Sequence, residues 1–141
     1  MNEKTLETIE LELAVIIRRT TSITTRNKLG NLDRSAYLLL QRIVSRGSAG
    51  VKTLADEFQL DISTVSRQAA ALEQKGYVYR IQDPQDGRFH TYEITELGRK
   101  EWAESKQARI KRVSELLQKW TKEEKEMFGT LLKKYNQSFF E

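Results

Sequence analysis

The hydrophobic periodicity of the chain changes at Gly76, and this change limits the fold more than any other feature of the sequence. Before Gly76, two short apolar stripes with helical spacing are separated by the tight connection 59–61. After it, the segments 77–82 and 89–94 alternate as strands do, with the turn-forming residues 83–87 between them. Two short helices joined by a turn and followed directly by a hairpin predict a winged helix-turn-helix, in which the hairpin is the wing.

The two helices expected before Gly76 each have one apolar face. The first stripe consists of Val51, Leu54, Ala55 and Phe58, and the second consists of Ile62, Val65, Ala69 and Leu72. We expect both stripes to face the core. Asp61 stands immediately before the second helix, and we expect its carboxylate to cap that helix by accepting backbone N–H hydrogen bonds.

Helices are also predicted on both sides of this unit. Leu6, Ile9, Leu13, Ile16 and Ile23 predict an amphipathic helix over residues 3–25, which a loop at 28–33 separates from the next helix. That next helix begins with Asp33 as its cap, carries Tyr37, Leu40, Ile43 and Val44, and ends near Gly47.

The C-terminal third is predicted to be helical as well. A helix capped by Thr95 and running to Trp120 would be about 39 Å long at 1.5 Å per residue. Thr121 begins the last helix, with Glu124 at the capping-box position. The flanking helices carry more apolar stripe than one winged unit can cover, so we expect them to bury each other across a two-fold axis.

The predicted fold class is therefore mostly α with a small β-hairpin wing, an α+β protein. One domain spans residues 1–141, with a winged helix-turn-helix lobe over 33–95. Segments 1–30 and 96–141 form N- and C-terminal dimerisation helices.

Composition excludes several kinds of chemistry. The 141 residues include no cysteine and one histidine, which removes disulfides, thiolate chemistry and a histidine-rich zinc site. There is no nucleophile–base constellation and no glycine-rich phosphate loop, so we expect neither an enzyme nor a bound cofactor. The sequence shows no signal peptide and no apolar run of the roughly 20 residues that span a bilayer. We expect a cytoplasmic protein without a membrane partner.

The net charge of +4 suits a polyanionic partner, but it is unevenly distributed. Residues 15–46 hold seven basic side chains against the single acid Asp33, whereas residues 47–100 hold seven basic and eight acidic ones. The winged unit is therefore not itself strongly basic. A phosphate-binding surface would have to borrow charge from neighbouring helices, although a solvated basic face would explain the same bias.

The outward face of the second helix carries the residues that could read a nucleic acid. This face comprises Ser63, Thr64, Arg67, Ala70, Ala71 and Gln74. Arg67 lies nearly opposite the apolar stripe, where its planar fork could reach guanine O6 and N7 in a major groove. Ser63 and Thr64 could donate hydroxyl groups at the positive end of the helix. The alternative is an ordinary exposed helical face with one arginine.

Arg88 follows the tip of the hairpin, two residues after Asp86. A carboxylate at that spacing could hold the guanidinium in one rotamer and lower the cost of inserting it into a minor groove. Alternatively, Asp86 stabilises the turn and Arg88 points into solvent. A calcium site at Asp83 and Asp86 is a weaker interpretation, because two acids fall far short of six to eight ligands.

His90 is expected on the same strand face as Tyr92 and Ile94, turned toward the domain, as a structural residue rather than a pH sensor. Tyr37, Trp102 and Trp120 are most simply core or interface residues. A ligand pocket that includes Tyr37 and Trp102 is the alternative.

Several of these runs together resemble the MarR family of regulators. They are Leu54-Ala55, Ser63-Thr64-Val65-Ser66-Arg67, Leu72-Glu73-Gln74-Lys75-Gly76-Tyr77-Val78, Asp83-Pro84-Gln85-Asp86-Gly87-Arg88 and Ile94-Thr95-Glu96-Leu97-Gly98. The pattern Asp-Pro-x-Asp-x-Arg at this distance from Leu-Glu-x-x-Gly is specific, and the motifs cover about a third of the chain.

The resemblance implies a homodimeric transcriptional regulator, usually a repressor, on a pseudo-palindromic double-stranded DNA operator. It implies that the second helix enters the major groove and the wing enters the minor groove. The DNA-binding residues would be Ser63, Thr64, Ser66, Arg67, Gln68, Asp86, Gly87 and Arg88. It also implies release by a small aromatic or lipophilic effector.

The chain departs from the family pattern at two wing positions. Gly87 stands where a basic or polar residue is common, and Phe89 stands where small residues are common. The lack of cysteine excludes regulation by thiol oxidation. The leading alternative function is a winged-helix protein-interaction module without specific DNA binding. RNA binding would favour exposed aromatic residues on the second helix, and that face has none.

Overall fold

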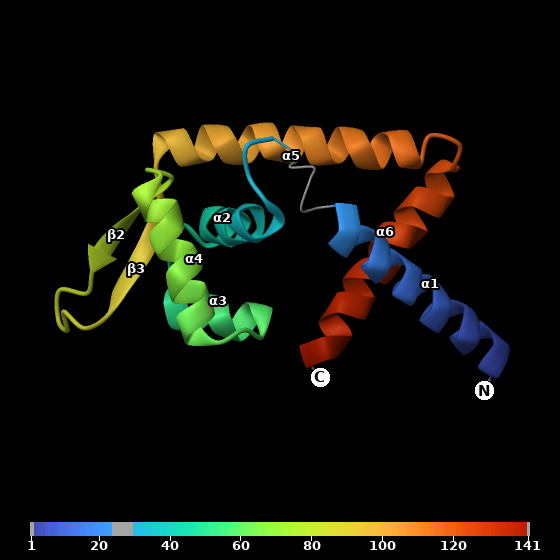
Figure 1. Ribbon diagram of the computed structural model, residues 1–141, viewed down its shortest axis with the longest axis horizontal. Helices are drawn as coiled ribbons and strands as arrows, with labels where there is room; N and C mark the ends of the chain where they lie inside the picture. Colours follow the sequence, from blue (N-terminus) through green and yellow to red (C-terminus); the bar gives the residue numbers. More distant parts are fainter. Residues whose placement is uncertain (1, 24–29, 141) are drawn as a thin grey trace. The chain divides into compact units, whose positions relative to one another are not determined.

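The computed structural model of the chain describes residues 2–23 and 30–140, with side chains for 2–20 and 30–140 (Figure 1). The chain divides into two compact units, residues 1–106 and 107–141. The first unit contains the helix-turn-helix and the sheet, and the second contains a helical hairpin. The described segments therefore agree with the predicted mostly helical α+β class.

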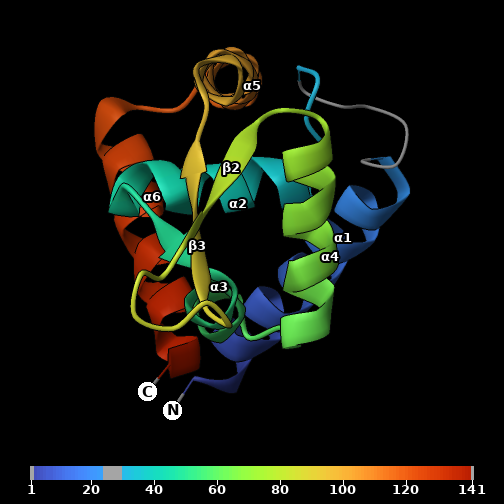
Figure 2. The same ribbon diagram turned by 90° about the vertical axis from the view of Figure 1, so that its left-hand side faces the viewer.

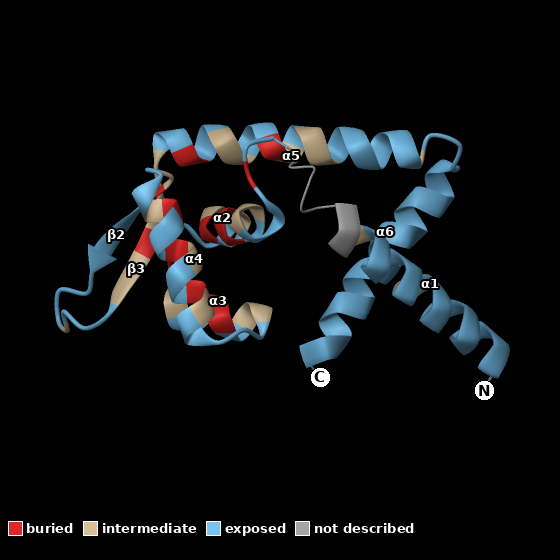
Figure 3. Cartoon of the chain, in the orientation of Figure 1, coloured by how far each residue is buried: buried red, intermediate tan, exposed pale blue. Residues whose placement is uncertain are grey.

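Three helices build the core of the first unit: α2 (Arg34–Arg46), α3 (Val51–Phe58) and α4 (Ile62–Gln74). Their buried faces meet, as the red segments of Figure 3 show. The fully buried side chains at the centre are Leu40, Ile43, Leu54, Val65 and Ala69. The spacing is three residues in α2 and four in α4, so one face of each of these helices turns inward.

A small antiparallel sheet packs on these helices, with β3 (His90–Ile94) between β1 (Ala49–Gly50) and β2 (Val78–Gln82) (Figure 2). The sequence predicted only the β2–β3 hairpin. β1 pairs Ala49 with Tyr92 and Gly50 with Thr91. A strand of two residues is too short to show an alternating pattern, so periodicity could not reveal it.

The ends of the core helices test the predicted caps. The Asp33 carboxylate accepts a hydrogen bond from the Ala36 N–H at 2.9 Å, which confirms that cap. The Asp61 prediction is wrong, because the side chain of Asp61 makes no capping hydrogen bond. Its backbone carbonyl accepts from the N–H groups of Thr64 and Val65 instead. Gly76 follows α4 with φ of 81°, a left-handed conformation that glycine adopts without strain.

Ile62 corrects the predicted stripe of α4. Its side chain is 54% exposed, whereas Val65, Ala69 and Leu72 are buried as expected. Ile62 is the first residue of the helix, one turn before Val65. At that end the helix has passed the edge of the core, so the correct helical phase no longer guarantees burial.

The wing joins the next helix, α5 (Glu96–Leu116), through a close backbone contact. Thr95 caps α5 as predicted, since its hydroxyl accepts from the Gly98 N–H at 2.9 Å. The same hydroxyl donates to the Gly76 carbonyl at 2.6 Å. A Cβ at Gly98 would lie 2.0 Å from the carbonyl oxygen of Tyr77, so only glycine fits there.

α5 is shorter than the sequence predicted. Its 21 residues end at Leu116 rather than Trp120, which gives a length of about 32 Å at 1.5 Å per residue. Residues 117–120 form the turn into α6 (Lys122–Gln137), whose capping box between Thr121 and Glu124 is present as predicted. A short 3-10 helix, Ser138–Phe140, follows.

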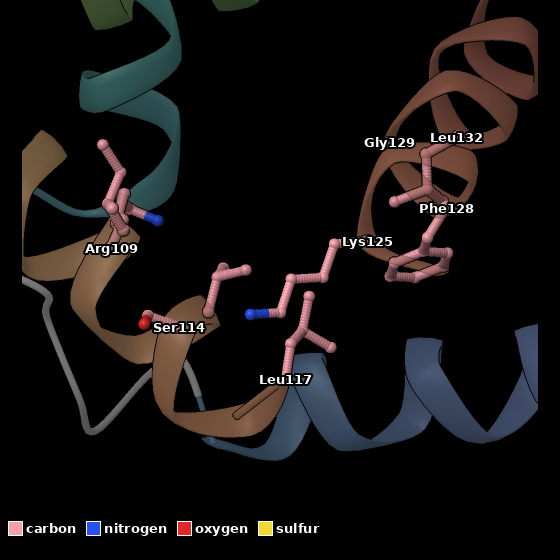
Figure 4. A pocket seen from close by; sticks show the side chains of 9 residues that line it. Arg109, Ser114, Leu117, Lys125, Phe128, Gly129 and Leu132 are labelled. Atoms are coloured by element: carbon pink, nitrogen blue, oxygen red, sulfur yellow. The ribbon is translucent and has the colours of Figure 1, made fainter. Parts of the chain in front are cut away.

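The second unit leaves its apolar side chains uncovered. None of the residues 121–140 is buried, and Met127, Leu131 and Phe139 are each more than half exposed. An apolar hollow of about 570 Å³ lies between the end of α5 and α6 (Figure 4). Its lining is Arg109, Ile110, Val113, Ser114, Leu117, Lys125, Phe128, Gly129 and Leu132.

The N-terminal helix α1 (Glu3–Ile23) is also amphipathic and exposed. Leu6, Ile9 and Ile16 on its predicted stripe are each about half exposed. The side chain of Ile23, Arg26 and the first two residues of the predicted loop, 28–29, lie outside the described residues. Across residues 2–23 and 30–140, no helix has the length and apolar character to span a membrane.

Candidate nucleic-acid interface

The outward face of α4 presents a polar row next to small residues. Ser63, Ser66 and Arg67 are exposed, and Thr64 is half-buried. Arg67 forms no hydrogen bond or ion pair with the other described residues, so its guanidinium group is available to a partner. Ala70 and Ala71 are exposed and small, which leaves this face open to close approach.

Gln68 lies apart from this row, although the resemblance placed it in the DNA-binding set. Its side chain is half-buried and lines a hollow of about 50 Å³ with Leu38, Phe58 and Leu60. The Gln68 side-chain oxygen is buried there without a hydrogen-bond partner among the described residues. Position 68 follows the buried Val65 by three residues, which turns it toward α2 and α3.

At the tip of the wing (residues 78–94), Asp86 holds Arg88 by a forked ion pair. Arg88 Nε donates to Asp86 Oδ1 at 3.1 Å, and Arg88 Nη2 donates to Oδ2 at 2.9 Å. Asp86 Oδ1 also accepts from the Arg88 backbone N–H at 3.1 Å. The hydrogen bonds from Arg88 lower the pKa of the Asp86 carboxyl, which therefore stays charged through the physiological range. The guanidinium side chain is 84% exposed, so it is oriented yet open to a partner.

The turn before Arg88 is held by its own hydrogen bonds. Asp83 N–H donates to the Phe89 carbonyl, and Asp83 Oδ1 accepts from the Gln85 N–H at 2.9 Å. Gly87 offers its carbonyl to the Gln82 side-chain amide at 3.1 Å. The two aspartates are thus engaged locally. The described residues contain no group of three acidic or histidine ligands that could hold a metal ion.

Phe89 and His90 point in different ways from the start of β3. Phe89 is 61% exposed, and the Arg88 guanidinium lies 5.9 Å from its ring centroid. His90 is half-buried and meets Tyr92 edge to face, with ring centroids 5.2 Å apart. Tyr92 is buried on the same face, which confirms the predicted orientation of that strand.

A second arginine on the wing was not singled out from the sequence. Arg80 Nε lies 3.4 Å from Glu73 Oε2, so an ion pair joins β2 to the end of α4. The wing carries a polar hollow of about 560 Å³, which is lined by Arg80, Gln82, Gly87, Arg88 and His90. The strand register brings these residues together, because Gln82 pairs with His90 and Arg80 pairs with Tyr92, and the sequence alone does not give that register.

The predicted pocket residues Tyr37 and Trp102 are both half-buried against the core. The indole N–H of Trp102 donates to the Gln41 side-chain oxygen at 2.9 Å. The Lys106 ammonium lies 5.1 Å from the Trp102 ring centroid. These contacts fit the simpler interpretation, that of aromatic residues that dock α5 on α2.

Part of the basic charge expected to assist the interface is paired within the lobe. Arg42 Nε lies 3.1 Å from Glu57, and Arg46 is bound to the other oxygen of the same carboxylate. Arg42 and Arg46 therefore share one counter-charge and hold α2 against α3.

Comparisons with known proteins agree with this geometry. Residues 32–90, which span the helix-turn-helix and most of the wing, match the MarR family profile. The chain is 47% identical to the HTH-type transcriptional regulator YxaD of Bacillus subtilis (strain 168), over 99% of both chains. The chain belongs to the MarR family. It is a transcriptional regulator rather than an enzyme, and MarR-family regulators bind DNA and act as dimers.

Solved MarR-family structures share the fold. A MarR family protein from Bacillus stearothermophilus superimposes with a TM-score of 0.78 at 23% identity, over 100% of this chain and 99% of that one. The transcriptional regulator BldR from Sulfolobus solfataricus gives a TM-score of 0.75 at 24% identity, over 97% and 99% of the two chains. The mostly helical winged-helix prediction is thereby confirmed.

Proposed function

We propose that this MarR-family regulator acts in the cytoplasm as a homodimeric repressor that binds a pseudo-palindromic operator through α4 and the wing. The observation that carries the proposal is that one unit presents two groups of side chains that can contact DNA, one on α4 and one at the tip of the wing. The exposed row on α4 fits a major groove, and the tethered Arg88 fits the adjacent minor groove. Two such units related by a two-fold axis would read a pseudo-palindrome.

In the major groove, Arg67 is the residue that we expect to read a base. Its unpaired, exposed guanidinium group can donate two hydrogen bonds to guanine. Ser63, Thr64 and Ser66 lie within the first turns of the same helix, where hydroxyl donors and the helix dipole favour phosphate. Gln68 supports this surface from inside, since it packs toward α2 and α3.

In the minor groove, Arg88 is the residue that we expect to enter. Asp86 orients its guanidinium group before binding, which reduces the entropy lost when the side chain is ordered on DNA. Gly87 contributes no side chain that would obstruct the approach, and its carbonyl is tied to Gln82. The wing thus offers one preorganised cation at its tip.

The apolar surfaces of α1 and of residues 107–141 support the homodimer. Each of these two segments leaves a row of apolar side chains exposed, and such rows mark interaction surfaces. A second copy is the occupant proposed for both rows, because MarR-family regulators act as dimers. Sedimentation at micromolar concentration tests it: twice the 16.4 kDa chain mass is expected, and a single species at 16.4 kDa would contradict it.

Release by a small aromatic or lipophilic effector is the regulatory part of the proposal. Some MarR-family regulators bind small molecules. The half-buried Tyr37 and Trp102 lie where α2 meets α5, so a ligand inserted between them would displace α5 relative to the lobe. Such a ligand should quench tryptophan fluorescence in the wild type and in Trp120→Phe, but not in Trp102→Phe. Equal quenching of the fluorescence of Trp102→Phe would contradict a ligand site beside Trp102.

Selection from a random DNA pool tests the DNA-binding proposal itself. We expect an enriched palindrome with half-sites about 34–36 Å apart, centre to centre. Affinity for the enriched duplex should fall steeply between two salt concentrations as counterions are released. A pool with no enriched sequence would contradict the proposal and favour the protein-interaction module.

A further inference from the structure

The polar hollow on the wing has no role in the proposed contacts of Arg67 and Arg88 with the two grooves. It lies on the side of the hairpin from which Arg80 reaches Glu73 of α4. Every lining residue except Gly87 has a side chain that can donate hydrogen bonds to an anion: Arg80, Gln82, Arg88 and His90. With a volume of about 560 Å³, the hollow is large enough to admit a phosphate group.

The guanidinium group of Arg80 is held at one edge of this hollow. Glu73 contacts Arg80 only through Nε, at 3.4 Å, and so leaves the two terminal nitrogens of Arg80 without a partner among the described residues. Arg88, which also lines the hollow, is held more firmly, by two side-chain hydrogen bonds to Asp86. The two carboxylates balance the charge of the two arginines, so the hollow offers oriented donors rather than a diffuse positive field.

We propose that this hollow binds one backbone phosphate of the DNA, at the rim of the minor groove that Arg88 enters. Arg80 and His90 are the donors. The inference rests on the proposed function and adds a contact that fixes how deeply the wing enters the minor groove. Phosphate contacts of this kind position a protein on DNA and carry no base information.

The spacing along the wing fits this assignment. Arg88 lies in the turn at the tip of the wing, and His90 begins β3 two residues later. A B-form minor groove is about 7.5 Å deep. His90 and its strand partner Gln82 stand farther from the tip than Arg88, so they would lie nearer the rim of the groove when Arg88 enters it.

The hollow also suits a backbone phosphate better than a free anion. The Arg80 side chain is 53% exposed and that of Arg88 is 84% exposed, so the hollow does not enclose its contents. A small free anion would keep much of its hydration there and bind weakly. A phosphate that is part of a duplex already held by α4 and Arg88 meets the same donors at high effective concentration.

The test uses the full chain and the duplex enriched from the random pool, synthesised with one neutral methylphosphonate at a time. For the wild type, we expect one backbone position bordering each wing at which the substitution weakens binding about tenfold, the effect of losing a charged hydrogen bond. Arg80→Gln should weaken binding to the unmodified duplex about tenfold and lose nothing further at that position.

Arg99→Gln is the matched control, because it removes the same charge from an exposed position in the first turns of α5. Its effect should add to that of every methylphosphonate. Additive losses for Arg80→Gln at every position would overturn the phosphate site. His90→Gln, which leaves the Arg80–Glu73 pair intact, should show the same loss of additivity at the same position with a smaller effect.

Replacing chloride by inorganic phosphate at constant ionic strength separates the two sources of a phosphate group. We expect the wild type and Arg80→Gln to lose DNA affinity equally in this exchange. Competition by phosphate in the wild type alone would assign the hollow to a free anion and overturn the backbone contact. Failure of the pool selection would instead contradict the proposed function, so the two failures are distinguishable.

Discussion

Asp86→Asn should weaken DNA binding even though it removes a negative charge from the DNA-binding surface. The carboxylate of Asp86 binds two nitrogens of Arg88 and also the Arg88 backbone N–H. Asparagine keeps an oxygen for the backbone N–H, so the turn is retained. It replaces the second oxygen with an NH₂ group that cannot accept from Arg88, which removes the forked pair.

Two opposing effects set the size of this change in affinity. Removing a charge near the phosphates in water favours binding by less than about 1 kcal/mol, and salt screens this gain beyond a Debye length of about 8 Å. Freeing Arg88 opposes binding, because ordering a long side chain costs about 0.5–1.5 kcal/mol. At about 0.3 M salt the ordering cost exceeds the electrostatic gain. We expect a net loss of about 0.5–1 kcal/mol for each protomer, a two- to fivefold rise in Kd.

Fluorescence anisotropy with a labelled duplex at pH 7 measures Kd for a double-mutant cycle of Asp86→Asn and Arg88→Ala. Arg88→Ala alone should cost about 1–3 kcal/mol. In the Arg88→Ala background, Asp86→Asn should leave Kd unchanged or lower it slightly, because only the charge effect remains. Because the pKa of Asp86 is lowered, the loss of DNA affinity caused by Asp86→Asn in the wild-type background should not vary between pH 6 and 8. Tighter binding by Asp86→Asn in the wild-type background at the same salt concentration would refute the reasoning.

Two further predictions concern stability and are read by chemical denaturation of the full chain. Gly98→Ala should cost about 2–4 kcal/mol, more than a usual overpacking penalty, because its Cβ would stand 2.0 Å from the Tyr77 carbonyl oxygen. Lys100→Ala, at an exposed position on the same helix, should change the free energy of unfolding by no more than about 0.5 kcal/mol. Equal denaturation midpoints for the two variants would contradict the close contact between Gly98 and Tyr77. Asp33→Ala should cost about 1 kcal/mol, whereas Asp61→Ala, which removes no capping hydrogen bond, should cost less than half as much.

The elements of the winged unit could be predicted because their signals are local. The stripe ending at Leu72, the left-handed Gly76 and the alternation after it each depend on a few neighbouring residues. The caps at Asp33, Thr95 and Thr121 were predictable for the same reason.

What the sequence could not supply depends on the ends of elements and on contacts between them. Ile62 has the right helical phase but lies beyond the edge of the core. Gln68 turns inward because α2 and α3 leave a hollow beside it. Strand β1 is defined only by its pairing with β3. The hollow that Arg80 borders exists only once the hairpin register and the ion pair to Glu73 are set.

The Asp86–Arg88 pair lies between these two cases. Its spacing was visible in the sequence, where a restrained arginine and a solvent-facing one were both open. The two side-chain hydrogen bonds to Asp86 show that Arg88 is restrained in the free protein. Glu73 contacts Arg80 through one nitrogen only, and because this pair joins residues from two elements, it leaves no pattern of spacing in the sequence.

The central claim is that the exposed row on α4 reads base sequence, and the affinity ratio between the selected duplex and a shuffled one tests it most directly. For the wild type, we expect a ratio of about 10³ or more, typical of specific DNA binding. Arg67→Ala should bind the shuffled duplex nearly as the wild type does and lose about 1–3 kcal/mol on the selected one. An equal loss on both duplexes would contradict the claim and make Arg67 a phosphate contact.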